Sequence, residues 1–195
     1  MKNLGLLIVA VMICSTISAE IVNVNSFAVK AKKTSDSGMI LELGIGSLGG
    51  SASGNGNSVK INGDGASLDL ALGYRKAFSP YIAWDILKLR AFGEISDLSA
   101  TITPQLLTAL RGNSPVLFAN AKAYVSAGIG YGYVIDPAAG GLCYELQAGL
   151  NFTQKFYLGF VYSGQNFKQE MSYSGNNYNF NYNVTFTGLR VGFKF

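Results

Sequence analysis

Apolar and polar residues alternate in short segments along most of the chain. The clearest segment is residues 123–134, where Val125, Ala127 and Ile129 alternate with serine and glycine. Such alternation predicts a β-strand with one apolar face and one small or polar face. Seven further segments show the pattern, namely residues 38–47, 66–74, 81–92, 103–112, 142–152, 156–165 and 185–195. The chain is therefore predicted to be all-β.

Two of these segments are less regular than the others. In residues 81–92 the alternation breaks at Leu87, which predicts a β-bulge at that position. Residues 103–112 fit a strand with Gln105 and Arg111 on one side, and they fit a helical turn within a loop equally well.

The connections between the segments differ in length and composition. Residues 75–80 and 151–155 are brief, whereas residues 48–65 and 166–178 are long and rich in glycine, serine and asparagine. This composition predicts flexible polar loops. Short and long connections in alternation are typical of antiparallel membrane barrels, with the short turns in the periplasm and the long loops outside the cell.

The first residues have the features of an export signal. Lys2 precedes an apolar run from Leu4 to Ile13, which is shorter than the roughly 20 residues that a membrane-spanning helix needs. The segment STISA then predicts cleavage after Ala19. A lipid-attachment signal at Cys14 is disfavoured because the large Ile13 stands before it.

The expected organisation follows from this cleavage site. Residues 1–19 are the predicted signal peptide, residues 20–37 an N-terminal leader, and residues 38–195 the outer-membrane barrel domain. Removal of the signal leaves Cys143 as the single thiol, so we expect no disulfide within the mature chain.

Composition narrows the fold further. The chain is 49% hydrophobic and 13% charged, and no apolar run of helical length follows the signal. Within a bilayer only helices and closed barrels satisfy every backbone hydrogen bond. We therefore predict a closed antiparallel transmembrane β-barrel of eight strands, or of ten if residues 20–37 contribute to it. The formal net charge of +4 is too small to indicate nucleic-acid binding.

The same alternation predicts which charged side chains point into the lumen. They form a candidate polar network of Glu42, Asp69, Arg111, Glu145 and Arg190. Side chains can fill the interior of an eight-stranded barrel, and buried charges need partners. We therefore expect a hydrogen-bonded network that fills the lumen. The alternative is a narrow selective pore lined by the same residues.

Two motifs carry a resemblance to a known group of proteins. One is the terminal TFTGLRVGFKF, which ends on Phe195, and the other is YVSAGIGYGY at residues 124–133. With these motifs, residues 38–195 resemble the small outer-membrane barrels of the OmpA, OmpX and opacity-protein type and porin-family proteins built on that barrel. The resemblance implies that the barrel-assembly machinery reads a C-terminal signal, here Leu189, Val191, Phe193 and Phe195.

Three functions are compatible with these features. The first is a structural or surface-interaction barrel with a filled lumen, which we expect, and the second is a small porin. The third, a lipid-modifying enzyme of the outer membrane, is disfavoured because the chain has no histidine to activate a hydroxyl nucleophile. We therefore expect no catalytic residues.

No cofactor or metal site is expected either. GIGSLG at residues 44–49 matches a dinucleotide-binding pattern, but a polar loop follows it where such a site requires a helix. The NGDG segment at residues 62–65 is read as a turn rather than a calcium loop.

The expected location is the outer membrane of the cell. The expected partners are outer-membrane lipid, the assembly machinery during biogenesis, and an extracellular ligand or host surface bound by the loops. Residues 166–183 interleave asparagines with aromatic residues, which suits binding of glycans or host proteins, but an aromatic girdle next to a solvated loop is the favoured explanation of this pattern. No nucleic-acid partner is expected.

Overall fold

The computed structural model describes residues 37–54, 57–95, 103–117, 121–134, 139–173 and 176–195. The predicted signal peptide, its cleavage site and residues 20–36 of the leader lie outside these described residues.

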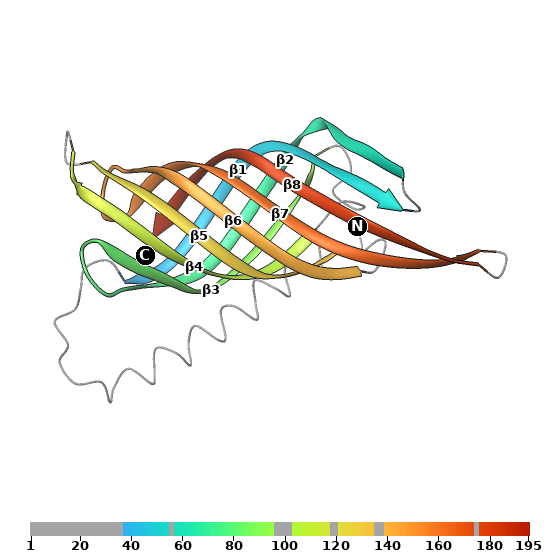
Figure 1. Cartoon of the computed structure of the whole chain (residues 1–195). Coiled ribbons are helices and arrows are strands. Elements are labelled where there is room, and N and C mark those ends of the chain that lie inside the picture. The colour runs from blue at the N-terminus through green and yellow to red at the C-terminus, as the bar shows by residue number, and fades with distance from the viewer. Residues whose placement is uncertain (1–36, 55–56, 96–102, 118–120, 135–138, 174–175) are drawn as a thin grey trace, which may run out of the picture. The chain divides into compact units, whose positions relative to one another are not determined.

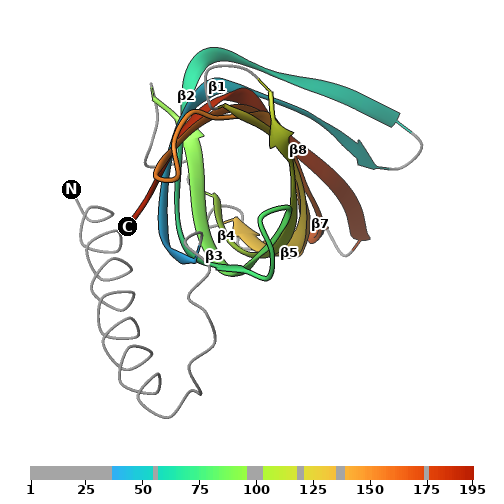
Figure 2. The same ribbon diagram turned by 90° about the vertical axis from the view of Figure 1, so that its left-hand side faces the viewer.

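Eight antiparallel strands in the described residues form a closed barrel (Figures 1 and 2). Each strand pairs with its neighbours in the sequence, and β8 pairs with β1 to close the ring. Because β1 and β8 pair directly, the alternative of ten strands is wrong. The strands are β1 (Gly38–Gly54), β2 (Asn57–Ala77), β3 (Ile82–Glu94), β4 (Thr103–Val116), β5 (Lys122–Val134), β6 (Ala139–Asn151), β7 (Phe156–Tyr173) and β8 (Asn176–Lys194).

The alternation in the sequence separates the inside of the barrel from the outside, as predicted. On β5 the side chain of Ile129 is 69% exposed on the outer wall, while that of Ser126 is buried on the lumen side. Leucine, isoleucine and aromatic side chains cover the outer wall of the other strands in the same way. An apolar exterior around a charged interior is the arrangement of an outer-membrane β-barrel.

The irregular segments also take defined structures. Residues 103–112 belong to β4, so the strand interpretation is confirmed and the helical turn is wrong. The pairing of β3 shifts between Asp85 and Lys88, which confirms the bulge predicted at Leu87. The bulge changes which residues of β3 face inward: Asp85 is buried before it, and Lys88 and Arg90 are buried after it.

The prediction of flexible loops at residues 48–65 and 166–178 is wrong. β1 continues to Gly54 and pairs there with β8, and β7 pairs with β8 as far as Tyr173. Backbone pairing needs no apolar side chain. Residues 48–54 pair with β8, residues 49–54 pair with β2, and residues 166–173 pair with β8. Cross-strand contacts support the pairing, because Phe167 stacks on Tyr182 with ring centroids 5.0 Å apart.

The NGDG segment is not a turn between strands, as the sequence suggested, but an irregular part of β2. Ser47 pairs with Ala66 and Gly49 with Asn62, so residues 63–65 lie in an interruption of the pairing between β1 and β2. Glycines suit such a bulge because they tolerate backbone conformations that side chains disfavour.

The short connections are confirmed as tight turns. The Ser79 hydroxyl accepts hydrogen bonds from the backbone N–H groups of Tyr81 and Ile82, and Thr153 does the same for Lys155 and Phe156.

Among the described residues, no helix has both the length and the apolar character needed to span a membrane.

Candidate functional site

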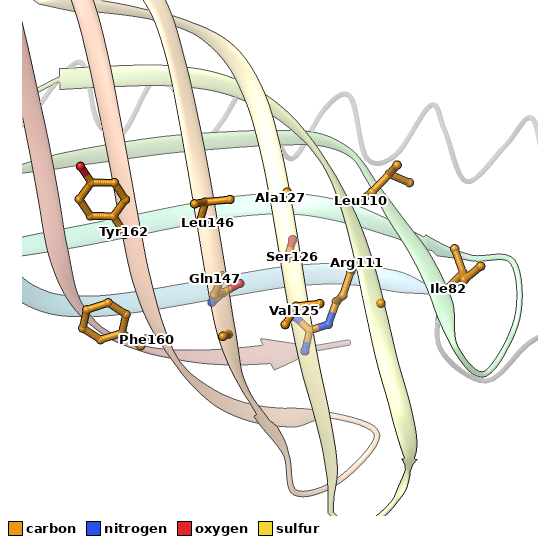
Figure 3. Close-up of a pocket in the computed structure, with 12 residues that line it drawn as sticks. Ile82, Leu110, Arg111, Val125, Ser126, Ala127, Leu146, Gln147, Phe160 and Tyr162 are labelled. Carbon is orange, nitrogen blue, oxygen red and sulfur yellow. The ribbon is translucent and has the colours of Figure 1, made fainter.

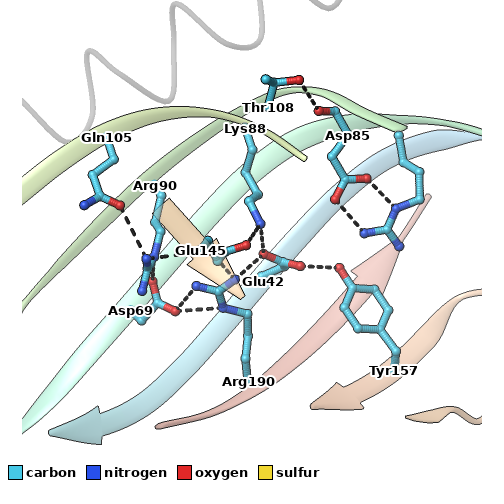
Figure 4. Close-up of polar contacts among 11 residues, drawn as sticks. Glu42, Asp69, Asp85, Lys88, Arg90, Gln105, Thr108, Glu145, Tyr157 and Arg190 are labelled. Atoms are coloured by element: carbon cyan, nitrogen blue, oxygen red, sulfur yellow. Dashed lines mark hydrogen bonds and ion pairs between the residues drawn. The ribbon is translucent and has the colours of Figure 1, made fainter. Parts of the chain in front are cut away.

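Six charged side chains from five strands meet in the lumen, and each is at most 2% exposed (Figure 4). Three are carboxylates and three are cations, so their formal charges cancel. We call this group the lumen network, and it consists of Glu42, Asp69, Lys88, Arg90, Glu145 and Arg190.

Arg190 lies at the centre of the lumen network. Its Nη1 donates to Glu42 Oε2 at 2.9 Å and to Glu145 Oε2 at 2.8 Å. Its Nε donates to Asp69 Oδ2 at 2.7 Å, and its Nη2 donates to the same oxygen. One guanidinium thus contacts all three carboxylates, which suits the fixed set of donors that arginine presents.

The other two cations complete the neutralisation. Lys88 Nζ donates to Glu42 Oε2 at 3.2 Å and also to Glu145. Arg90 Nε donates to Asp69 Oδ1 at 2.7 Å, and its Nη1 lies 3.6 Å from Glu145 Oε2. Such partners offset the desolvation of the buried ions, which costs several kcal/mol per ion.

The bonds of the lumen network reach across the barrel. Lys88 on β3 contacts Glu145 on β6, and these strands are not neighbours in the sheet. Tyr157 on β7 donates its hydroxyl to Glu42 Oε1 on β1 at 2.7 Å, and again the two strands are not neighbours. Side-chain contacts therefore span the lumen at this level, and Figure 4 shows these contacts.

Further side chains fill the lumen beside the network. Gln105 Nε2 donates to Gln165 Oε1 at 3.1 Å, which links β4 to β7. Phe92, Val161 and Phe186 form a buried apolar cluster. The guanidinium of Arg90 lies 4.8 Å from the ring centroid of Phe92, so this cluster adjoins the network directly.

A second ion pair lies in the lumen at Arg75 and Asp85. Arg75 Nε donates to Asp85 Oδ1 at 2.6 Å and its Nη2 to Oδ2 at 2.9 Å. This two-bond geometry is among the strongest that charged side chains make. The Arg75 guanidinium also lies 5.1 Å from the ring centroid of Tyr157, which connects the pair to the network.

Arg111 faces the lumen but lies apart from the carboxylates of the network. Its Nε donates to Asn113 Oδ1 at 3.4 Å and its Nη2 donates to Asn151. Its guanidinium lies 3.4 Å from the ring centroid of Tyr124 and 4.4 Å from that of Tyr157. The structure thus brings together four of the five residues named from the sequence and places Arg111 elsewhere.

Two members of the lumen network, Lys88 and Arg90, were not predicted from the sequence. Both follow the bulge of β3, where the inward face changes from odd to even residue numbers. The break at Leu87 was visible in the sequence. Continuing the alternation from the far side of that break would have turned both cations inward.

The four residues of the predicted assembly signal lie at the end of the chain with their side chains on the outer wall. Leu189, Phe193 and Phe195 are exposed, and Val191 is partly buried. The Phe195 backbone N–H donates to Met39 O at 2.9 Å, which joins the last residue to β1. Their recognition by an assembly machinery stays a prediction.

The outer wall carries a hollow of about 550 Å³ lined by residues of β3 to β7 (Figure 3). Ala127 and Ala148 leave space there between the larger Val125, Leu146 and Phe160. Most of the lining is apolar and faces outward, so the hollow belongs to the surface that contacts lipid.

Comparisons with known protein families and with curated proteins find no match. Solved structures do match. Neisserial surface protein A is 12% identical, with 80% of this chain and 97% of that chain covered and a TM-score of 0.46. OprG from Pseudomonas aeruginosa is 13% identical, with 82% and 98% covered and a TM-score of 0.41. AlkL is 12% identical, with 87% and 96% covered and a TM-score of 0.42. The chain is similar to these small outer-membrane barrels.

Proposed function

We propose that this chain is an integral outer-membrane barrel with a closed lumen and a structural or surface-interaction role. The observation that supports the proposal is the lumen network, in which six buried charges bond to one another across the barrel. A pore would need water and ions in the volume that these side chains occupy.

Energetics favour a lumen that stays closed. Opening a path would separate Arg190 from its three carboxylates or Lys88 from two of them. The apolar cluster of Phe92, Val161 and Phe186 then offers an ion no polar contact in exchange.

The paired extensions of β1, β2, β7 and β8 support the surface role. They carry strands beyond the level at which β2 pairs with β3, whose pairing ends at Ser67 and Glu94. Asn183 Nδ2 donates to Asn166 Oδ1 at 2.7 Å on one face of this extension. A paired sheet with polar and aromatic side chains offers a surface for contact with another molecule.

A solute-flux assay tests the closed lumen. Mature protein refolded into liposomes is diluted into isotonic arabinose, and swelling is followed by light scattering, with a general porin as the positive control. We expect swelling no faster than that of empty liposomes. Swelling that increases with the amount of protein inserted would reject the proposal in favour of a small porin.

A further inference from the structure

Four buried polar groups without a hydrogen-bond partner gather on one patch of the lumen wall. They are Arg111 Nη1, Tyr124 Oη, Ser126 Oγ and Gln147 Nε2. Each of the four residues is at most 6% exposed. Arg111 pairs with Ser126 across β4 and β5, and Ser126 pairs with Gln147 across β5 and β6. Figure 3 shows Arg111, Ser126 and Gln147 side by side on these strands.

Arg111 differs from the other buried cations whose partners the structure describes. Arg75, Lys88, Arg90 and Arg190 each contact a carboxylate. Arg111 makes no ion pair with any residue that the structure describes. Asparagine oxygens and two tyrosine rings compensate part of its charge, but these partners are neutral.

The patch offers donors and a positive charge, and so it needs an acceptor that carries a negative charge. All four unpartnered groups can donate a hydrogen bond. The residues that pair with Arg111 in the sheet are small, Ala83 on β3 and Ser126 on β5, and the rings of Tyr124 and Tyr157 lie against its guanidinium. Burying a donor without a partner is unfavourable, and more so when the donor is charged.

We propose that this patch binds a small monovalent inorganic anion such as chloride, held by Arg111 Nη1 together with the Ser126 hydroxyl and the Gln147 amide. The anion neutralises Arg111 and satisfies donors that the protein leaves open. The site is independent of whether the barrel conducts.

Crystallography with bromide tests the site directly. The refolded mature protein is crystallised from sodium bromide, and anomalous density is collected at the bromine edge. We expect a bromide within hydrogen-bonding distance of Arg111 Nη1. A water molecule at that position, or bromide at surface sites alone, would overturn the proposal.

A solution measurement uses a matched pair of variants. Chloride replaces gluconate at constant ionic strength while urea unfolding is followed. Above the dissociation constant, tenfold more chloride should lower the unfolding equilibrium constant about tenfold. Arg111→Gln should lose this response, and Lys155→Gln in an exposed turn should keep it. An unchanged response in Arg111→Gln would contradict the site, and if that variant does not refold, the bromide experiment decides.

Discussion

At the scale of single residues, Arg190 has the most demanding environment in the barrel. It is fully buried and contacts Glu42, Asp69 and Glu145, so its removal leaves three carboxylates to two cations in the lumen network. We expect Arg190→Gln to lower the free energy of unfolding by about 3–5 kcal/mol in urea. Lys155→Gln, in an exposed turn, should change it by about 0.5 kcal/mol or less. Equal effects of the two substitutions would show that the network contributes little.

Gly192 provides a separate test of lumen packing. A Cβ at this position would overlap the ring of Tyr157, whereas a Cβ at Gly112 would meet only Val125 Cγ2 at 3.9 Å. Overpacking costs about 1–3 kcal/mol. We expect Gly192→Ala to lose that much stability in urea unfolding and Gly112→Ala to lose less. Similar midpoints for the two variants would mean that the Tyr157 ring is not fixed against β8.

Residue-level prediction from the sequence succeeds where a strand is regular. Alternation alone turned Glu42, Asp69, Glu145 and Arg190 inward, and the structure places them there. It did not predict the partner of each charge, because contacts such as that of Lys88 with Glu145 depend on which strands face each other across the lumen. Arg111 shows the same limit, since alternation turned it inward but did not predict that it lies apart from the carboxylates of the lumen network.

At the scale of the elements, the two long hairpins are the main departure from expectation. Polar composition indicated loops at residues 48–65 and 166–178, but β1 pairs with β8 as far as Gly54, and β7 pairs with β8 as far as Tyr173. The pattern of residue types indicates whether a segment has an apolar face. It does not indicate whether the backbone of that segment forms strand pairs, because pairing depends on the length of the neighbouring strand.

The hairpins also indicate the expected orientation of the barrel in the membrane. Lys60 is exposed on β2 in the long β1–β2 hairpin, and Lys155 is exposed in the short turn before β7. On intact cells, a membrane-impermeant maleimide should label Lys60→Cys and not Lys155→Cys, because long hairpins face outward in such barrels. Native Cys143 is 3% exposed and should give little background. Labelling of Lys155→Cys alone on intact cells would reverse the topology.

A prediction on assembly concerns Phe195, the residue that follows β8. Phe195 is 70% exposed on the outer wall, so its side chain contributes little packing within the barrel. We expect deletion of Phe195, or Phe195→Asp, to reduce the outer-membrane yield in cells far more than it lowers the urea midpoint of refolded protein. A normal yield with a large fall in midpoint would show that Phe195 has only a structural role.

At the scale of the whole molecule, the closed barrel follows from two facts visible in the sequence. The alternating segments predicted the strands. The need to satisfy every backbone hydrogen-bonding group within a bilayer predicted that the strands close into a barrel. The direct pairing of β1 with β8 decides between eight and ten strands, and no local pattern encodes that pairing. The filling of the lumen is also a property of the whole, because it depends on side chains from strands on opposite sides of the barrel.

Single-channel recording tests the closed lumen most directly. Purified mature protein, refolded and inserted into a planar bilayer in potassium chloride, is recorded over a range of voltages, with insertion verified by protease protection. The lumen network predicts a current indistinguishable from that of the bare bilayer. Stable unitary conductance steps, recurring at one size across independent insertions, would contradict a lumen closed by Glu42, Lys88, Glu145 and Arg190.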